Sequence, residues 1–192
     1  MTVQTLKPRD KLFWFCAGFG GVVAIYFCIR IITPHEANLA NFRTITHDNE
    51  CSLQVPYYLH ETDSIYERAM LQFTDTAKSV FLVLVSEKKA DLEKIGVKPT
   101  LFEYADYVRV AIEDAFTSSK PVAIKSGIVN TMETITYELE GDFGDEKIFY
   151  IVSVYSSPKI FYQLISWAKT DMKPQIRKDI YTTLQSLSLL EE

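Results

Sequence analysis

The sequence predicts an α+β domain, an antiparallel sheet of six to seven strands packed by helices, preceded by one N-terminal transmembrane helix. The first observation is that the 18 residues from Leu12 to Ile29 carry no charge. An apolar helix of about that length can cross a bilayer core. The second is a series of strand-like apolar segments joined by short turns. The third is that two segments with helical apolar spacing interrupt and close this series, an order typical of α+β folds.

The apolar segment 12–32 predicts a retained membrane anchor. Lys7, Arg9 and Lys11 precede it, and basic residues also begin a signal peptide, but the apolar core of a signal peptide is only about 7–15 residues long and ends in small residues. A cleaved signal peptide and a buried soluble helix remain alternatives. By the positive-inside rule, residues 1–11 are expected in the cytoplasm and the domain outside it, in the periplasm or the extracellular space.

Small residues recur along one face of this helix, at Ala17, Gly21, Ala24 and Cys28. Such a stripe allows a second helix to approach closely. The stripe is therefore a candidate packing face for a second copy of the chain or for another membrane protein. The simpler interpretation, which we favour, is a single anchor that contains small residues and has no partner.

The composition limits the classes of partner and site. A net charge of −5, without a basic cluster in the domain, argues against nucleic-acid binding. Cys51 is the only cysteine outside the anchor, which excludes a disulfide within the domain and a cysteine-rich zinc site. Residues 33–49, with Pro34 near their start, read as a linker. Residues 50–192 are sufficient for one domain with its own core.

The first half of the domain reads as three strands and a helix. Strands are predicted over 51–56, 69–73 and 80–85. The last is continuously apolar and rich in valine, so it is expected to be central and covered on both faces. Thr100 and Glu103 have the spacing of a capping box, and apolar residues at helical spacing follow them.

The second half reads as four strands and a helix. The strands are predicted over 122–129, 131–139, 148–155 and 160–168, with polar turns over 141–147 and 156–159, and strands joined by such short turns are antiparallel. Pro174 suits the first turn of the last helix. The buried face of that helix is predicted at Ile176, Ile180, Leu184 and Leu187.

This order of elements is similar to that of the PsbP-like fold. The extrinsic photosystem II protein PsbP, its bacterial relatives and a Ran-binding nuclear import factor share that fold. The features that carry the resemblance are residues 51–56, the helix after 81–85, the hairpin around 141–147 and the final segment 180–187. The resemblance covers about residues 50–190 and implies a non-enzymatic binding or assembly role. It assigns no functional residue, and the anchor is a departure from the lumenal photosystem protein that argues against a photosynthetic role.

No catalytic residue, metal ligand or cofactor site is predicted. His60 has Glu61 and Asp63 nearby, but the spacing differs from the His-Glu-x-x-His pattern of zinc proteins. A solvated loop is the simpler interpretation. The acidic stretch 142–146 does not fit the spacing of an EF-hand, so it is interpreted as the tip of a hairpin.

Aromatic residues are frequent on the last two predicted strands. They are candidates for protein contacts or for an apolar ligand pocket if some of them are exposed. The alternative is that helices cover both faces of the sheet and bury them. The candidate interaction residues are Tyr150, Tyr155, Phe161, Tyr162 and Trp167.

Together these features predict a membrane-anchored, non-enzymatic accessory domain that binds an envelope protein. The alternative is a domain that binds a small ligand or lipid in a groove between sheet and helix. An enzyme is the third hypothesis, because residues distant in sequence can meet in the fold.

Overall fold

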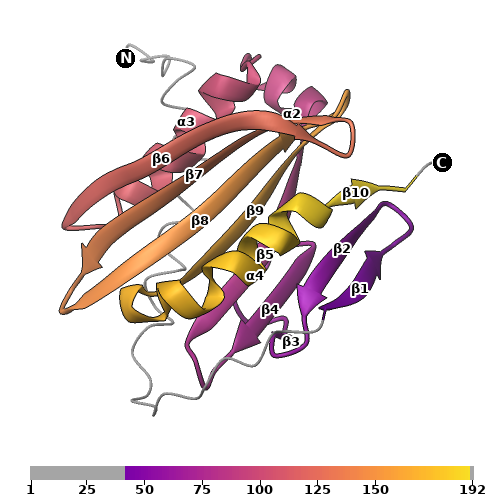
Figure 1. Cartoon of the computed structure of the whole chain (residues 1–192). Helices are drawn as coiled ribbons and strands as arrows, with labels where there is room; N and C mark the ends of the chain where they lie inside the picture. Colours follow the sequence, from indigo (N-terminus) through magenta and orange to yellow (C-terminus); the bar gives the residue numbers. More distant parts are fainter. Residues whose placement is uncertain (1–41, 191–192) are drawn as a thin grey trace, which may run out of the picture.

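A seven-stranded antiparallel sheet lies at the centre of the computed structural model, which describes residues 42–190 apart from the side chains of residues 121–123. The strand order is β3-β4-β5-β9-β8-β7-β6. This confirms the predicted antiparallel sheet with helices (Figure 1). The strands are β3 (His60–Glu61), β4 (Leu71–Asp75), β5 (Val80–Lys88), β6 (Ser118–Val129), β7 (Met132–Phe143), β8 (Glu146–Ser156) and β9 (Ile160–Lys169).

A second, three-stranded sheet corrects the expectation of a single sheet. It consists of β1 (Phe42–His47), β2 (Cys51–Pro56) and β10 (Ser188–Leu189), with β2 in the middle. Residues 42–49 were expected in the linker, but they form β1 and most of its turn to β2. The turn places Asp48 and Asn49 at φ of 44° and 55°, a left-handed conformation that these residue types tolerate.

The helices lie on opposite faces of the large sheet. Figure 1 shows α2 (Lys89–Lys94) and α3 (Leu101–Glu113) on one face and α4 (Lys173–Ser186) on the other. A 3-10 turn, Thr170–Met172, leads into α4. The predicted capping box begins α3: Thr100 Oγ1 accepts from the Glu103 amide, and the Glu103 carboxylate accepts from the Thr100 amide at 2.8 Å.

Each face of the sheet has its own apolar core. Under α3, Val83, Tyr137 and Ile165 pack with buried residues of the helix. Under α4 and the small sheet, Leu82 and Leu164 pack with the stripe predicted for the last helix, and all four residues of that stripe are buried. Because both faces are covered, successive residues of a central strand are apolar, as the run at 80–85 indicated.

Tight turns join the long strands. Asn130 and Thr131 form the two-residue turn between β6 and β7, at φ of 44° and 74°. Gly144 and Asp145 turn β7 into β8, so the turn predicted over 141–147 is shorter than expected, because both strands extend toward the tip. The side chain of Asn130 also donates to the Leu187 carbonyl at 2.9 Å, which ties this turn to the residue that follows α4.

The predicted anchor 12–32, with its stripe of small residues, and the linker residues 33–41 lie outside the described residues. Within residues 42–190, no helix has both the length and the apolar character needed to span a membrane.

Candidate functional site

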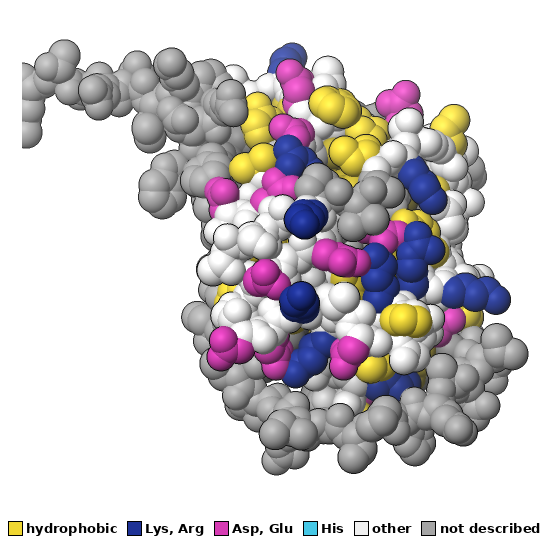
Figure 2. Space-filling view, turned by 60° about the vertical axis from the view of Figure 1, so that its left-hand side comes forward, with side chains coloured by type: hydrophobic (Ala, Val, Ile, Leu, Met, Phe, Trp, Pro, Cys, Tyr) yellow, Lys and Arg dark blue, Asp and Glu magenta, His cyan; other side chains and the backbone are white. Residues whose placement is uncertain are grey.

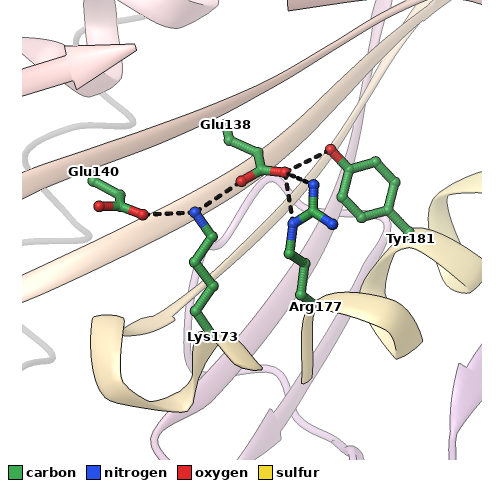
Figure 3. A network of polar contacts seen from close by, with 5 residues as sticks. All are labelled: Glu138, Glu140, Lys173, Arg177 and Tyr181. Carbon is green, nitrogen blue, oxygen red and sulfur yellow. Dashed lines mark hydrogen bonds and ion pairs between the residues drawn. The ribbon is translucent and has the colours of Figure 1, made fainter. Parts of the chain in front are cut away.

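Glu138 is a carboxylate on the sheet face that α4 covers, and only 2% of it is exposed. Alternation along β7 places it with Thr134 and Thr136, which are buried as well. Burial of an ionised carboxylate is costly unless charged or hydrogen-bonding partners compensate. The partners of Glu138 come from α4, as Figure 3 shows.

Three residues of α4 contact Glu138. Arg177 Nε donates to Glu138 Oε1 at 2.9 Å, and the Tyr181 hydroxyl donates to the same oxygen at 2.8 Å. Lys173 Nζ lies 2.9 Å from Glu138 Oε2 and 2.6 Å from Glu140 Oε1 (Figure 3). These residues are four positions apart along the helix, a spacing that places their side chains on one face.

The network keeps Glu138 ionised. Burial by itself raises the pKa of a carboxyl group, but hydrogen bonds from Arg177, Lys173 and Tyr181 outweigh it and lower the pKa of Glu138 to about 2. With Glu140 included, two carboxylates face two cations. The network therefore fixes α4 on the sheet without leaving a buried net charge.

An open groove of about 880 Å³ lies beside this network, between α4, β2 and the β6–β7 turn. Its walls carry amides, hydroxyls and two cations, Arg177 and Lys178, and none of its lining residues is acidic. The side chain of Arg177 is 45% exposed, although two of its nitrogens bind Glu138. Lys125 of β6 adds a cation, with Nζ 5.6 Å from the centroid of the Tyr181 ring.

The candidate interaction aromatics are not on the surface. Tyr150, Phe161 and Trp167 lie in the core under α3, and Tyr155 and Tyr162 lie in the core under α4, each at most 5% exposed. This corrects the hypothesis of an exposed aromatic patch on these strands. The reason is that helices and the small sheet cover both faces, which was the alternative interpretation.

Other apolar side chains are exposed instead. Ile124 and Ile128 of β6 are 56% and 75% exposed, Phe102 of α3 is 65% exposed, and Tyr57 is 54% exposed. Figure 2 turns the left-hand side of Figure 1 toward the viewer, and hydrophobic side chains gather toward the top of that face, with mixed charges below them. Sequence reasoning did not predict this distribution, because a linear pattern does not show which strands of the sheet the helices cover.

The structure does not assemble a metal site near His60 or in the acidic stretch 142–146, the two places considered from the sequence, within the residues it describes. His60 and Glu61 are exposed on β3. Within residues 42–190, no three histidine, cysteine or acidic side chains are grouped so that they could hold a metal ion. At the hairpin tip, Asp142 accepts from the Ser118 hydroxyl at 3.2 Å and Glu146 pairs with Lys169.

Sequence reasoning missed the Glu138 network. The available signals were the polar residues on alternate positions of β7 and the spacing of Lys173, Arg177 and Tyr181. Neither signal indicates that the two segments meet, because the contact joins positions 39 residues apart.

Comparisons with known proteins give the fold. No protein-family model and no curated protein sequence matches the chain. Among solved structures, cyanobacterial PsbP (CyanoP) from Synechocystis sp. PCC 6803 matches with a TM-score of 0.61 and 11% identity, over 82% of this chain and 97% of that one. The chain has the PsbP-like fold.

A second PsbP-like match is LpqN of Mycobacterium tuberculosis, described as involved in cell envelope biogenesis. It has a TM-score of 0.58 and 9% identity, over 80% of this chain and 93% of that one. These matches confirm the resemblance that the order of elements indicated. At such low identity the likeness concerns the fold, and no residue role is transferred from either protein.

Proposed function

We propose that the chain is a membrane-anchored, non-enzymatic accessory domain that binds an envelope protein on the outer side of the membrane. The likeness to CyanoP and LpqN over nearly their whole length supports the accessory role, and the description of LpqN supports a place at the cell envelope. The apolar segment 12–32 and its basic flank support the anchor and the orientation.

The surface proposed for this partner is the groove beside α4, and the proposed occupant is an acidic, extended segment of the partner protein. The observation that carries this choice is the lining of the groove, which contains Arg177 and Lys178 but no carboxylate, in a chain of net charge −5. Glu138 holds Arg177 in place before any partner arrives. A pre-organised guanidinium loses less conformational entropy when it binds a carboxylate.

Photo-crosslinking from the groove tests this proposal. A crosslinking amino acid at Gln185, in the full chain in its membrane, is expected to capture an acidic segment of one envelope protein, which mass spectrometry then locates. Lys178→Glu should abolish this crosslink by reversing a charge in the groove. Lys147→Glu is the matched control, because Lys147 is exposed near the distant β7–β8 turn.

Three outcomes contradict the proposed docking surface: a captured segment that is not acidic, a crosslink that survives Lys178→Glu, and equal capture from a crosslinker placed at Lys147.

The anchor and its orientation are tested separately with reporter fusions. Alkaline phosphatase fused after residue 192 should be active and a green fluorescent protein at that position should be dark. The reverse pattern overturns the proposed orientation.

A second candidate function, the binding of a small ligand between sheet and helix, is favoured by a separate cavity on the opposite face of the sheet, between β5 and α3.

A further inference from the structure

Strand β6 is the outermost strand of the large sheet. It pairs with β7 along one edge, and among the described residues no strand pairs with its other edge (Figure 1). The strand is 12 residues long, and a long free edge presents unpaired N–H and C=O groups to which another strand can bind. Irregular pairing with β7 at Pro121 and Ala123 limits the regular part of this edge to residues 124–129. All of these residues except Val129 are exposed.

The side chains of this regular part alternate between the two faces of the sheet. Lys125 belongs to the α4 face, because its Nζ lies 5.6 Å from the centroid of the Tyr181 ring of α4. Ile124, Ser126 and Ile128 therefore belong to the α3 face. Helix α3 contacts β7 and β8, and the two isoleucines are left more than half exposed. The free edge thus carries apolar side chains on both sides of a serine.

Backbone geometry decides which residues can bind a strand at this edge. In an antiparallel ladder, alternate residues direct their N–H and C=O groups toward the same neighbouring strand. The two-residue turn that follows Val129 makes Val129 one of the residues that bond to β7. Alternation back from Val129 directs the backbone groups of Ile128, Ser126 and Ile124 away from β7. The residues with exposed apolar side chains therefore also offer hydrogen bonds at the edge.

We propose that β6 pairs antiparallel with β6 of a second copy of the chain, around a two-fold axis at Ser126. Ile124 of each copy then lies opposite Ile128 of the other, the two Ser126 residues lie opposite each other, and each of these pairs exchanges two hydrogen bonds. On the other face, Lys125 lies opposite Gly127, which has no side chain. The edge is self-complementary in this register, because apolar side chains meet and no two charges are directly opposed.

The neighbouring registers lack this match. An axis at Lys125 would place the two Lys125 side chains directly opposite each other, and like charges in that position destabilise a ladder. An axis at Gly127 would place Ile124 opposite Asn130, which lies in the β6–β7 turn. The match of charge and apolar side chains around Ser126 is the reason to assign the edge to a second copy.

This pairing goes beyond the proposed function, since it involves only this chain and does not require the envelope protein. A two-fold axis between antiparallel edge strands is perpendicular to the sheet. The α4 faces of both copies, with their docking grooves, therefore lie on the same side of the joined sheet.

Cysteine crosslinking of the full chain in its membrane tests the pairing. Cys16 and Cys28 are first replaced by alanine, and the buried Cys51 is kept. Ser126→Cys then places two thiols at opposed positions with Cα atoms about 5.5 Å apart, which suits a disulfide. The matched control is Ser64→Cys, at an exposed serine that follows β3 at the opposite edge of the sheet.

Oxidation is expected to give a covalent dimer of the Ser126→Cys chain, in at least tenfold higher yield than from Ser64→Cys. Equal yields at the two positions, as a dimer joined only through residues 12–32 would give, overturn the proposal. Crosslinking of Ser126→Cys to a different protein overturns it as well.

Substitutions at Gly127 test the register at low ionic strength and leave the fold intact, because a Cβ atom there meets nothing within 4 Å. Gly127→Lys places a positive charge opposite Lys125 of the second copy, and it should lower the yield of the Ser126→Cys dimer at least fivefold. Gly127→Glu places a negative charge opposite the same Lys125 and should preserve the yield. A yield from Gly127→Lys that equals or exceeds the yield from Gly127→Glu overturns the proposed register.

Discussion

Arg177 Nε donates a hydrogen bond to Glu138 Oε1 at 2.9 Å and thereby joins α4 to β7 across 39 positions of the sequence. The apolar stripe of α4 buries the helix on the sheet, but apolar contacts are not directional. The ion pair fixes the position of α4 relative to β7, because the guanidinium and the carboxylate must meet at defined positions on the helix and the strand. Stripe and ion pair together define how α4 lies.

Removal of the Glu138 charge should destabilise the domain at neutral pH. Glu138→Gln leaves Arg177 and Lys173 without their shared buried partner, and loss of one member of a buried pair costs about 3–5 kcal/mol. Because the side chain of Arg177 is 45% exposed and can be hydrated, we expect about 2–4 kcal/mol. Chemical denaturation monitored by circular dichroism measures this change.

The same pair should lose its contribution in acid. The pKa of Glu138 is about 2 in the fold and about 4.3 in an unfolded chain. A lowered folded-state pKa gives stability that is present above the unfolded value and is lost as the pH falls toward the folded value. The stability difference between parent and Glu138→Gln should therefore shrink between about pH 4.3 and pH 2. Glu140→Gln, at a carboxylate that is 37% exposed, is the control and should have a smaller effect at neutral pH.

A side chain at Gly141 should conflict with Phe116. A Cβ atom at position 141 would overlap the ring of Phe116, which packs edge-on against Tyr150 with centroids 5.6 Å apart. We expect Gly141→Ala to cost about 1–3 kcal/mol, as overpacking does. Gly127→Ala is the matched control, because a Cβ atom there meets nothing within 4 Å. In a double-mutant cycle with Phe116→Ala the two costs should not add, and additive costs would refute the contact.

The capping box of α3 should contribute measurably to stability. Thr100→Ala removes the acceptor for the Glu103 amide and should cost about 1 kcal/mol in thermal or chemical unfolding. Glu103→Gln retains an oxygen that can accept from the Thr100 amide, so its cost should be smaller. Equal costs would mean that the charge of Glu103 at the helix start matters more than the box.

Cys51 should resist alkylation in the folded protein. Burial raises the pKa of its thiol to about 11, and Glu50 adds to the increase, so little thiolate exists at pH 8. Iodoacetamide should modify Cys51 only after denaturant is added, as mass spectrometry of the peptide that contains it would show. Rapid modification without denaturant would indicate that β2 opens locally.

Particular elements show how far sequence reasoning reached. The capping box located the start of α3, and all four residues predicted for the buried stripe of the last helix are buried. Strand β1 was missed because its residues pair only with β2, and β10 was missed because two residues after a helix carry no periodicity. The burial of Thr134 and Thr136 could not be predicted, because alternation assigns a residue to one face of the strand but does not show which element covers that face.

The sequence by itself determined the main elements and their antiparallel order, because periodicity, caps and turn residues are local properties of the chain. The order of these elements carries the resemblance to the PsbP-like fold. It also determined the prediction of an anchor at 12–32, through length and hydropathy alone. Only the tertiary structure decided that the strand aromatics are core and that Glu138 meets Arg177. Those contacts join distant segments, and their energies depend on burial and distance, which a linear pattern does not contain.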